Sequence, residues 1–238
     1  MAENVLMPEM SWTEIELALK DRPIALLPVA TDTVIAIEMA RRTAIRLKQR
    51  GLPSLIASPV TFCVSELGTA FPGTVSLPPD TAVALVRELC VSLAKQFRAV
   101  ALVNVNQEPA NLEALKRATE EAKKAGASVC FTEFQKKRWV DRLGAAFNAG
   151  DHAGSFETSL MLACASATVR EKERISLPPM DALGAALKKG AKSFAEAGGE
   201  DAYFGDPSAA SVEEGEAHFT TLADILTLSI MEHLGSKA

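Results

Sequence analysis

Residues 24–36 read IALLPVATDTVIA, and this stretch decides the fold class of the chain. A short apolar run, IALLPV, is followed by a turn with Asp32, and an apolar helical pattern begins directly after it. A strand-length apolar run that leads at once into a helix is typical of α/β folds with buried parallel strands. Ligands and catalytic groups of open α/β sheets gather at such strand–helix junctions. Asp32 is therefore the first candidate site residue.

The same alternation of apolar runs and helical patterns continues along the chain and predicts a mainly parallel sheet covered by helices. Strands are expected at 24–29, 53–60, 99–106 and 127–134, and helices at 11–20, 33–50, 80–97, 108–126, 155–169 and 211–234. Residues 181–210 are rich in Gly, Ala and Pro, and we expect them to be partly irregular. Because no repeat or linker interrupts the pattern, we predict a single α/β/α three-layer domain with a parallel-rich central sheet over residues 1–238.

The composition excludes several classes of protein. The chain has 238 residues, of which 48% are hydrophobic and 23% charged, and its formal net charge is −5. Its basic residues are spread out, with no Lys/Arg-rich stripe that contains aromatic residues, so we expect no nucleic-acid partner. No apolar run reaches the length of a membrane span, and the N-terminal stretch MAENVLMPEM does not resemble a signal peptide. We therefore expect a cytoplasmic protein that does not bind membranes.

Cysteine and histidine usage limits the possible chemistry. The four cysteines are far apart and form no CxxC pair, which favours buried apolar roles over metal or disulfide use. With three histidines in the chain, a multi-histidine metal site would need all of them to converge. Motifs of other hydrolases and of phosphate-binding loops, such as GxSxG and HExxH, are absent from the sequence.

Six stretches in series resemble the creatininase family of metal-dependent creatinine amidohydrolases. They are MSWTEIELAL, ALLPV followed by TDTVIA, FPGTVSL, VALVN, DHAGSFETSLML and YFGDPSAAS. The resemblance covers nearly the whole chain, and it implies an α/β/α fold and, as is common in the family, a hexamer. It also implies a reaction in which two metal ions hold a water molecule that attacks a C–N bond.

Measured against the family pattern, the metal ligands of this chain look incomplete. The family's Glu-x-His loop before the TD aspartate is missing, although Asp32 itself remains. Asn106 stands where the family has a histidine of an Asn-Gly-His motif, and Glu108 remains at a second carboxylate position. Where relatives often have Glu-His, this chain has Glu66 followed by Leu67. Because an amide is a poor ligand for transition metals, the resemblance implies a degraded metal site with Asp32 and Glu108 as remnant ligand positions and Asn106 and Glu66 as pocket residues.

Asp32 and Glu108 have an alternative role at the starts of helices. Asp32 lies between two threonines directly before a helix, where an N-cap residue contributes about 1 kcal/mol. Glu108 precedes Pro109, a residue that favours the first turn of a helix. Without partner ligands, these local roles are favoured over metal binding.

The stretch DHAGSFETS is the best-preserved part of the resemblance. In active relatives its histidine acts near the substrate as an acid/base group, and the acidic residue before it supports this role. Here the pair is Asp151 and His152, which are our catalytic candidates because an adjacent acid raises the pKa of an imidazole and selects its tautomer. Glu157, a third pocket residue, belongs to the Glu-Thr-Ser part, which we expect to cap and anchor a buried helix.

These observations leave three functions open. The first is a pseudoenzyme: a creatininase-like protein without its dinuclear metal site that serves as a non-catalytic binding or assembly subunit. The alternative is an amidohydrolase-type enzyme that hydrolyses a C–N bond of a small cyclic amide at an altered mononuclear-metal or metal-free site. The third is a small-molecule sensor that uses the vacated pocket.

The same reading sets the expected cofactors and partners. We expect no cofactor, or alternatively one weakly bound zinc or manganese ion. The expected partners are a small molecule or a partner protein, in a homo-oligomer or in a mixed oligomer with an intact relative.

Overall fold

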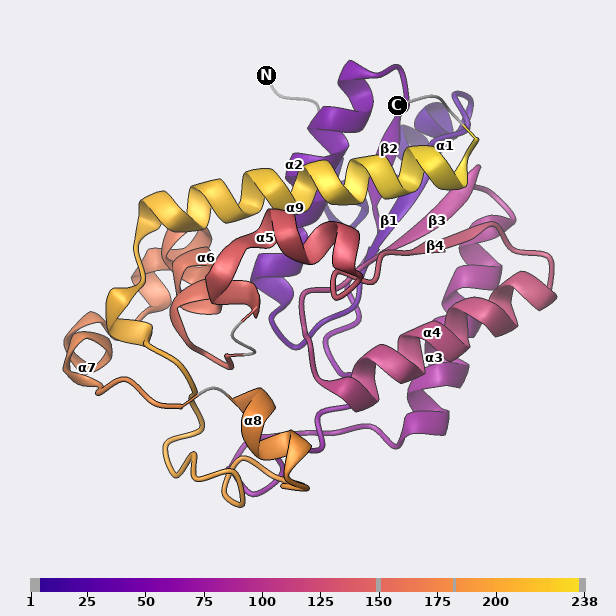
Figure 1. Ribbon diagram of the computed structural model, residues 1–238. Coiled ribbons are helices and arrows are strands. Elements are labelled where there is room, and N and C mark those ends of the chain that lie inside the picture. The colour runs from indigo at the N-terminus through magenta and orange to yellow at the C-terminus, as the bar shows by residue number, and fades with distance from the viewer. Residues whose placement is uncertain (1–4, 149–150, 182, 236–238) are drawn as a thin grey trace. The chain divides into compact units, whose positions relative to one another are not determined.

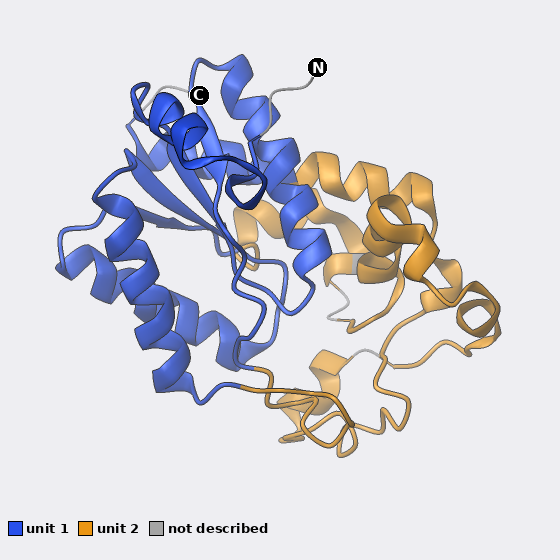
Figure 2. Ribbon diagram, turned by 180° about the vertical axis from the view of Figure 1, so that it is seen from behind, with its two compact units in different colours: residues 1–64, 77–133, 223–238 blue, residues 65–76, 134–222 orange. Residues whose placement is uncertain are grey.

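The computed structural model describes residues 5–148, 151–181 and 183–235, which divide into two compact units (Figure 2). Unit 1 consists of residues 1–64, 77–133 and 223–238, and unit 2 of residues 65–76 and 134–222. Each unit is thus assembled from separate stretches of the chain. The prediction of a single domain stays a prediction.

Unit 1 contains a four-stranded parallel sheet, as the sequence predicts. Its strands are β1 (Ile24–Pro28), β2 (Ser54–Ile56), β3 (Ala99–Val103) and β4 (Val129–Phe131), in the order β2-β1-β3-β4. In register, Ile24 of β1 lies opposite Ser54 on one side and Ala99 on the other. Every residue of β1 and β3 is buried, as expected for central strands that are covered on both faces.

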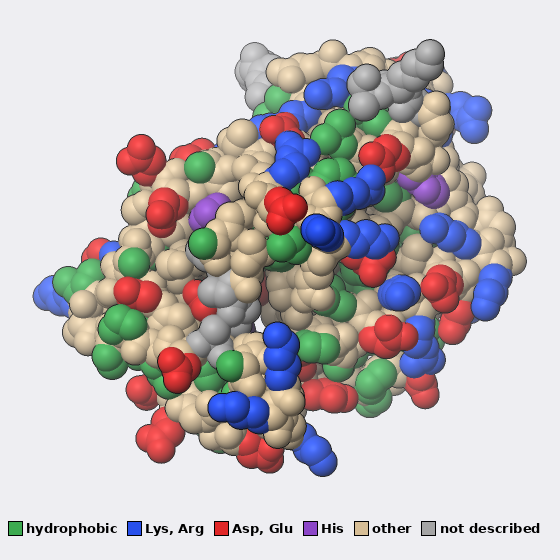
Figure 3. Space-filling view, viewed as in Figure 1, with side chains coloured by type: hydrophobic (Ala, Val, Ile, Leu, Met, Phe, Trp, Pro, Cys, Tyr) green, Lys and Arg blue, Asp and Glu red, His purple; other side chains and the backbone are tan. Residues whose placement is uncertain are grey.

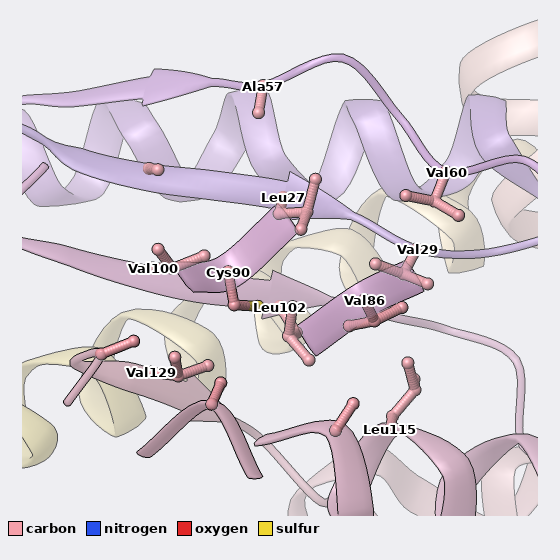
Figure 4. Packing of buried hydrophobic residues seen from close by; sticks show 14 of the residues in the cluster. Leu27, Val29, Ala57, Val60, Val86, Cys90, Val100, Leu102, Leu115 and Val129 are labelled. Carbon is pink, nitrogen blue, oxygen red and sulfur yellow. The ribbon is translucent and has the colours of Figure 1, made fainter. Parts of the chain in front are cut away.

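Helices cover both faces of this sheet. The helices of unit 1 are η1 (Met7–Glu9), α1 (Trp12–Leu19), α2 (Thr33–Gln49), α3 (Pro79–Ala94), α4 (Pro109–Lys124) and the C-terminal part of α9 (Val212–His233). On one face, apolar side chains of the strands pack against apolar side chains of α3 and α4 (Figure 4). The strands contribute Leu27, Val100, Leu102 and Val129, and the helices contribute Val86, Cys90 and Leu115. On the other face lie α2 and the end of α9 (Figure 1), which are joined by an ion pair of 2.6 Å between Arg46 Nε and Asp224 Oδ1. The predicted α/β/α layers are therefore present in unit 1.

Unit 2 is mostly helical. Its elements are α5 (Lys137–Asn148), α6 (Ser155–Ala165), η2 (Ser166–Thr168), α7 (Glu171–Ser176), α8 (Leu183–Lys188), η3 (Pro207–Ala209) and the first part of α9. Four buried residues form its apolar cluster: Leu67, Leu183, Phe194 and Phe204. Helix α5 is interrupted at Gly144, whose φ is 83°. None of the helices in the described residues is long and apolar enough to cross a membrane.

Candidate functional site

The sheet order of unit 1 places a switch point between β1 and β3. The chain leaves β1 toward β2 on one side and leaves β3 toward β4 on the other. The loops at the carboxyl ends of two such strands diverge, and ligands of open α/β sheets bind in the crevice between them. Asp32 follows β1, and Asn106 and Glu108 follow β3. Three sequence-predicted site residues therefore come from the two loops that flank this switch point.

The side chain of Asn106 connects these two loops. Its Nδ2 donates to Thr31 Oγ1 at 3.3 Å, and its Oδ1 accepts from the backbone N–H of Glu108 at 2.7 Å. Behind it, Nδ2 of the buried Asn104 donates to the backbone oxygen of Asn106 at 2.8 Å. Nδ2 of Asn111 in turn donates to Asn104 Oδ1 at 3.1 Å. An amide network thus fixes the carboxyl edge of the sheet.

Asp32 and Glu108 both occupy N-cap positions, the first of α2 and the second of α4, yet neither side chain makes a capping hydrogen bond. At the start of α2, Thr33 Oγ1 instead donates to the backbone oxygen of Ala30 at 3.0 Å. The expected positions at helix starts are confirmed, with Pro109 in the first turn of α4. The hydrogen-bonded cap expected from the Asp32 side chain is wrong, and the Thr33 hydroxyl instead bonds within the turn between β1 and α2.

Cys63 belongs to the same edge, although the sequence did not single it out. Burial raises the pKa of its thiol to about 11, against a smaller lowering by a backbone hydrogen bond with Thr31. The carboxylates of Glu108 and Asp32 raise this pKa further, so both act on the same sulfur. Cys63 therefore stays a neutral thiol at physiological pH and is unsuited to act as a nucleophile. We call Thr31, Asp32, Cys63, Asn106 and Glu108 the sheet-edge cluster.

In unit 2, His152 is held by its backbone and by its ring. Its N–H donates to the oxygen of Phe204 at 3.3 Å, and its oxygen accepts from the N–H of Phe204 at 2.7 Å. The imidazole stacks on Phe194, with ring centroids 4.3 Å apart and an interplanar angle of 23°. With 38% of its side chain exposed, His152 has a fixed orientation but remains open to solvent.

Glu157, in the first turn of α6, supplies an acidic neighbour for His152. Its Oε2 lies 3.6 Å from His152 Nδ1 and accepts from the N–H of Ala153 at 2.7 Å. Burial raises the pKa of Glu157 to about 6, the hydrogen bond from Ala153 lowers it, and the nearby Asp151 raises it. The expected anchoring role of the Glu-Thr-Ser stretch is confirmed, because Thr158 Oγ1 also donates to the oxygen of Ala153 at 3.0 Å.

Asp151 is enclosed by glycines. A Cβ atom at Gly205 would lie 2.2 Å from Asp151 Cγ, and one at Gly154 would lie 2.7 Å from its Cβ. Burial raises the pKa of Asp151, and the neighbouring carboxylate of Asp206 raises it further. His152 forms an ion pair with Glu157, and the supporting role of Asp151 stays a prediction.

The remaining predicted pocket residue, Glu66, lies in a turn of unit 2. It is exposed, and its backbone oxygen accepts from the N–H and the hydroxyl of Thr69. The next residue, Leu67, is buried in the apolar cluster of unit 2. The pocket role of Glu66 stays a prediction.

The predicted site residues thus form two groups, one in each unit. Asp32, Asn106 and Glu108 lie together in the sheet-edge cluster of unit 1. In unit 2, Asp151, His152 and Glu157 lie together, and we call them with Phe194 and Gly205 the His152 cluster.

Comparisons with known proteins agree with this architecture. Residues 8–230 match the family model for creatininase, described as creatinine amidohydrolase. The chain belongs to the creatininase family. A mycofactocin precursor peptide peptidase from Mycobacterium tuberculosis (strain CDC 1551 / Oshkosh) is 31% identical over 210 residues, which are 83% of this chain and 76% of that protein. A second such peptidase, from Mycolicibacterium smegmatis, is 29% identical over 204 residues, covering 83% and 75%.

The solved structures support the creatininase fold. A structure described as creatininase Mn superposes with a TM-score of 0.70 and 20% sequence identity, covering 97% of this chain and 98% of the other. At this level of identity the similarity shows the fold alone. The fold implied by the sequence resemblance is confirmed.

The metal pair implied by the creatininase family does not fit the donor atoms that the described residues bring together. The sheet-edge cluster offers the carboxylates of Asp32 and Glu108, the neutral amide of Asn106 and a protonated thiol. The histidine of unit 1, His233, hydrogen-bonds Ser128 before β4, at the opposite edge of the sheet. Across the described ranges 5–148, 151–181 and 183–235, no three His, Cys, Asp or Glu side chains are grouped so that they could hold a metal ion. A dinuclear centre needs several carboxylates and imidazoles, so we derive no chemistry through metal ions.

Four residues of the two clusters were not predicted as site residues: Thr31, Cys63, Phe194 and Gly205. Cys63 and Phe194 lie far in sequence from their neighbours and carry no local motif. Gly205 has a positive φ of 91°, a backbone conformation that favours glycine. Its second role, leaving room for Asp151, depends on a contact across more than fifty residues and has no local signal.

Proposed function

We propose that this creatininase-family protein is an amidohydrolase-type enzyme that hydrolyses a C–N bond of a small cyclic amide or short peptide, with His152 as its acid/base group. The observation that carries the proposal is the His152 cluster: an oriented, partly exposed imidazole with a carboxyl group of raised pKa beside its Nδ1. Family membership and the two peptidase relatives support the C–N bond as the target.

The proposed chemistry uses the two nitrogens of the imidazole differently. The carboxylate of Glu157 lies 3.6 Å from Nδ1 and favours a proton on that nitrogen, so we assign Nε2 to the reacting water. Nε2 removes a proton from water as the oxygen adds to the carbonyl carbon, and then returns a proton to the departing nitrogen. One amide and one water give one acid and one amine. Stacking on Phe194 keeps the ring in place during both transfers.

The test is amine release from creatinine and from a panel of short peptide amides. We compare the wild-type protein with His152→Ala and with the control His233→Ala, which removes the histidine that hydrogen-bonds Ser128. Each protein is assayed with EDTA and, separately, with added zinc or manganese. We expect turnover with EDTA and a loss of about 100-fold or more in kcat for His152→Ala alone, the usual contribution of a general acid/base.

Two outcomes oppose this proposal. Turnover that survives in His152→Ala assigns the chemistry to other residues. Turnover that needs added metal and disappears with EDTA would show that ligands outside the sets described above rebuild a metal centre.

A second candidate function is that of a non-catalytic binding or assembly subunit. The observation that favours it is the donor set of the sheet-edge cluster, which lacks the imidazoles of a family metal centre. It predicts no turnover of any substrate in the panel under any metal condition. Co-purification with a catalytically intact relative, or a rise in melting temperature with a small molecule that is not turned over, would then support it.

A further inference from the structure

Ala153, the residue directly after His152, has a backbone conformation that most residues avoid. Its φ is 50°, which lies in the left-handed region. In this region the Cβ of an alanine comes too close to the following carbonyl oxygen, whereas glycine adopts the same angle at no steric cost. Strained backbone of this kind persists only where its surroundings enforce it, and it is concentrated at active sites. The conformation of Ala153 therefore points to a role beside the His152 cluster.

Two side chains near the start of α6 hold Ala153 in this conformation. Its N–H donates to Glu157 Oε2 at 2.7 Å, and its backbone oxygen accepts from Thr158 Oγ1 at 3.0 Å. Both backbone polar groups of the strained residue are thus bound by neighbouring residues of one helix. On the other side, the backbone of His152 pairs with Phe204 through hydrogen bonds in both directions. The turn between His152 and α6 is therefore held from both sides.

The carboxylate oxygen that binds Ala153 also faces the imidazole. Glu157 Oε2 lies 3.6 Å from His152 Nδ1. A single oxygen can meet both a backbone N–H and a ring nitrogen only while these two groups keep a fixed relation to each other. That relation depends on the turn at Ala153, and Thr158 supplies the second hydrogen bond that holds this turn. Relaxation of Ala153 to a negative φ would separate Nδ1 from the carboxylate.

We propose that Thr158 is a positioning residue for the hydrolysis: its hydroxyl holds Ala153 in the left-handed conformation and thereby keeps Nδ1 of His152 beside Glu157. This inference rests on the proposed role of His152 as the acid/base group. A threonine hydroxyl has one proton to donate, and here it donates to the oxygen of Ala153. Thr158→Val removes that donor with little change in shape. Without it, we expect the imidazole to carry its proton on Nε2, the nitrogen that must accept a proton from water.

The test reads the tautomer of His152 by NMR of the ring nitrogens, in protein that contains ¹⁵N-labelled histidine. The spectra are recorded at pH 8, where Glu157 is ionised because its pKa is about 6. The chain has three histidines, and histidine side chains reach the face of the molecule drawn in Figure 3. The signals of His152 are therefore identified by their absence from His152→Ala. Amine release from the substrate panel is measured on the same proteins.

Three variants accompany Thr158→Val. Thr158→Ser keeps the hydroxyl. Thr168→Val is the matched control, because it removes a threonine hydroxyl that donates to the backbone oxygen of Ala165 at 2.7 Å. Ala153→Gly/Thr158→Val tests the route of the effect. Because glycine adopts a positive φ without strain, the Thr158 hydroxyl should no longer be needed in this double variant.

We expect the proton on Nδ1 in the wild-type protein, in Thr158→Ser and in Thr168→Val, and on Nε2 in Thr158→Val. In Thr158→Val the kcat should fall about tenfold while KM stays within about twofold, because the imidazole is misplaced and the contacts that bind substrate remain. The double variant Ala153→Gly/Thr158→Val should recover most of the kcat and the Nδ1-protonated tautomer.

Four outcomes overturn the proposal. Turnover with an unchanged tautomer in Thr158→Val removes the role of Thr158 alone and leaves the proposed function standing. A double variant that is no better than Thr158→Val shows that the hydroxyl does not act through Ala153. If Thr158→Val does not fold and adding Ala153→Gly does not restore folding, the hydroxyl has only a structural role. No turnover by the wild-type protein overturns the proposed function, and this inference falls with it.

Discussion

At the scale of single residues, Gly205 shows how the His152 cluster depends on an absent side chain. Its φ is 91°, and a Cβ there would lie 2.2 Å from Asp151 Cγ. Gly190 has a similar φ of 98° but no atom within 4 Å of a built Cβ, which makes it a matched control. We expect Gly190→Ala to cost about 1 kcal/mol of backbone strain and Gly205→Ala roughly 1–3 kcal/mol more from the clash. Urea unfolding measures the loss of unfolding free energy in both variants. Equal losses would contradict the role of Gly205 in leaving room for Asp151.

Glu157 provides a prediction about pH. Its folded-state pKa of about 6 is above the ordinary 4.5, so between these values the folded protein binds more protons than the unfolded chain. Stability contributed by the protonated carboxyl is therefore present at pH 4.5 and lost as the pH rises through 6. Glu157→Gln stays neutral and keeps an acceptor for the N–H of Ala153. We expect Glu157→Gln to remove up to about 2 kcal/mol of the decline in unfolding free energy as the pH rises.

The measurement is the free energy of unfolding of both proteins from pH 4.5 to pH 7.5. Stability profiles that run parallel over this range would show that the carboxyl of Glu157 titrates normally.

Site residues were predictable from the sequence where a motif, or a position directly after a strand, identified them. Asp32 and Glu108 follow strands in a fold that gathers ligands there, and the structure places both beside Cys63. His152 was chosen from its motif, and it lies beside Glu157, five residues further on. The stacking partner Phe194 is more than forty residues away, and pairing across such a distance depends on tertiary packing that no local pattern encodes.

At the scale of elements, Arg174 ties helix α7 to the segment that follows Gly205. Its Nη1 donates to the backbone oxygens of Pro207, Ser208 and Ala210 at 2.6, 2.9 and 3.3 Å. With 11% of its side chain exposed, it is a largely covered charge that satisfies several acceptors at once. Removing such a group leaves those carbonyls unpaired, so we expect Arg174→Ala to cost about 2–3 kcal/mol.

The matched variant is Arg170→Ala, just before the same helix, where an exposed arginine contacts the oxygen of Thr168. We expect this variant to stay within about 0.5 kcal/mol of wild type. Limited proteolysis followed by mass spectrometry should show faster cleavage between residues 205 and 211 in Arg174→Ala only. Similar cleavage in both variants would mean that Arg174 does not anchor the segment.

Elements with strong local signals were predicted well. The helix expected at 11–20 is α1, whose N-cap Ser11 forms a complete capping box: Ser11 Oγ accepts from the N–H of Glu14, whose carboxylate accepts from the N–H of Ser11. Strand β2 is shorter than the expected 53–60, because pairing with β1 ends at Ile56. Helices α5 and α7 were not predicted. Helix α7 has six residues and buries none, and the glycine at 144 interrupts α5, so neither has a long apolar period.

At the scale of the whole molecule, the sequence order hides the division into two units. Unit 2 takes residues 65–76 from between a strand and a helix of unit 1, and α9 runs from one unit into the other. The amino-acid composition does not change where the chain passes from one unit to the other, so no linker can be recognised in the sequence. The parallel sheet was predictable because each buried strand is a continuous apolar run, whereas membership of a unit depends on contacts between distant stretches.

The melting temperature of the whole molecule should not respond to zinc or manganese. A metal ion bound to the folded state at one hundred times its Kd adds about 2.7 kcal/mol, which would raise the melting temperature of a chain of this size by about 5–10 °C. Because the sheet-edge cluster offers two carboxylates and a neutral amide, we expect no such rise with zinc or manganese and no fall after dialysis against EDTA. Elemental analysis of protein purified without chelator should give well under one ion per chain. A full equivalent, lost together with several degrees of melting temperature in EDTA, would mean that ligands outside the sheet-edge cluster bind the metal.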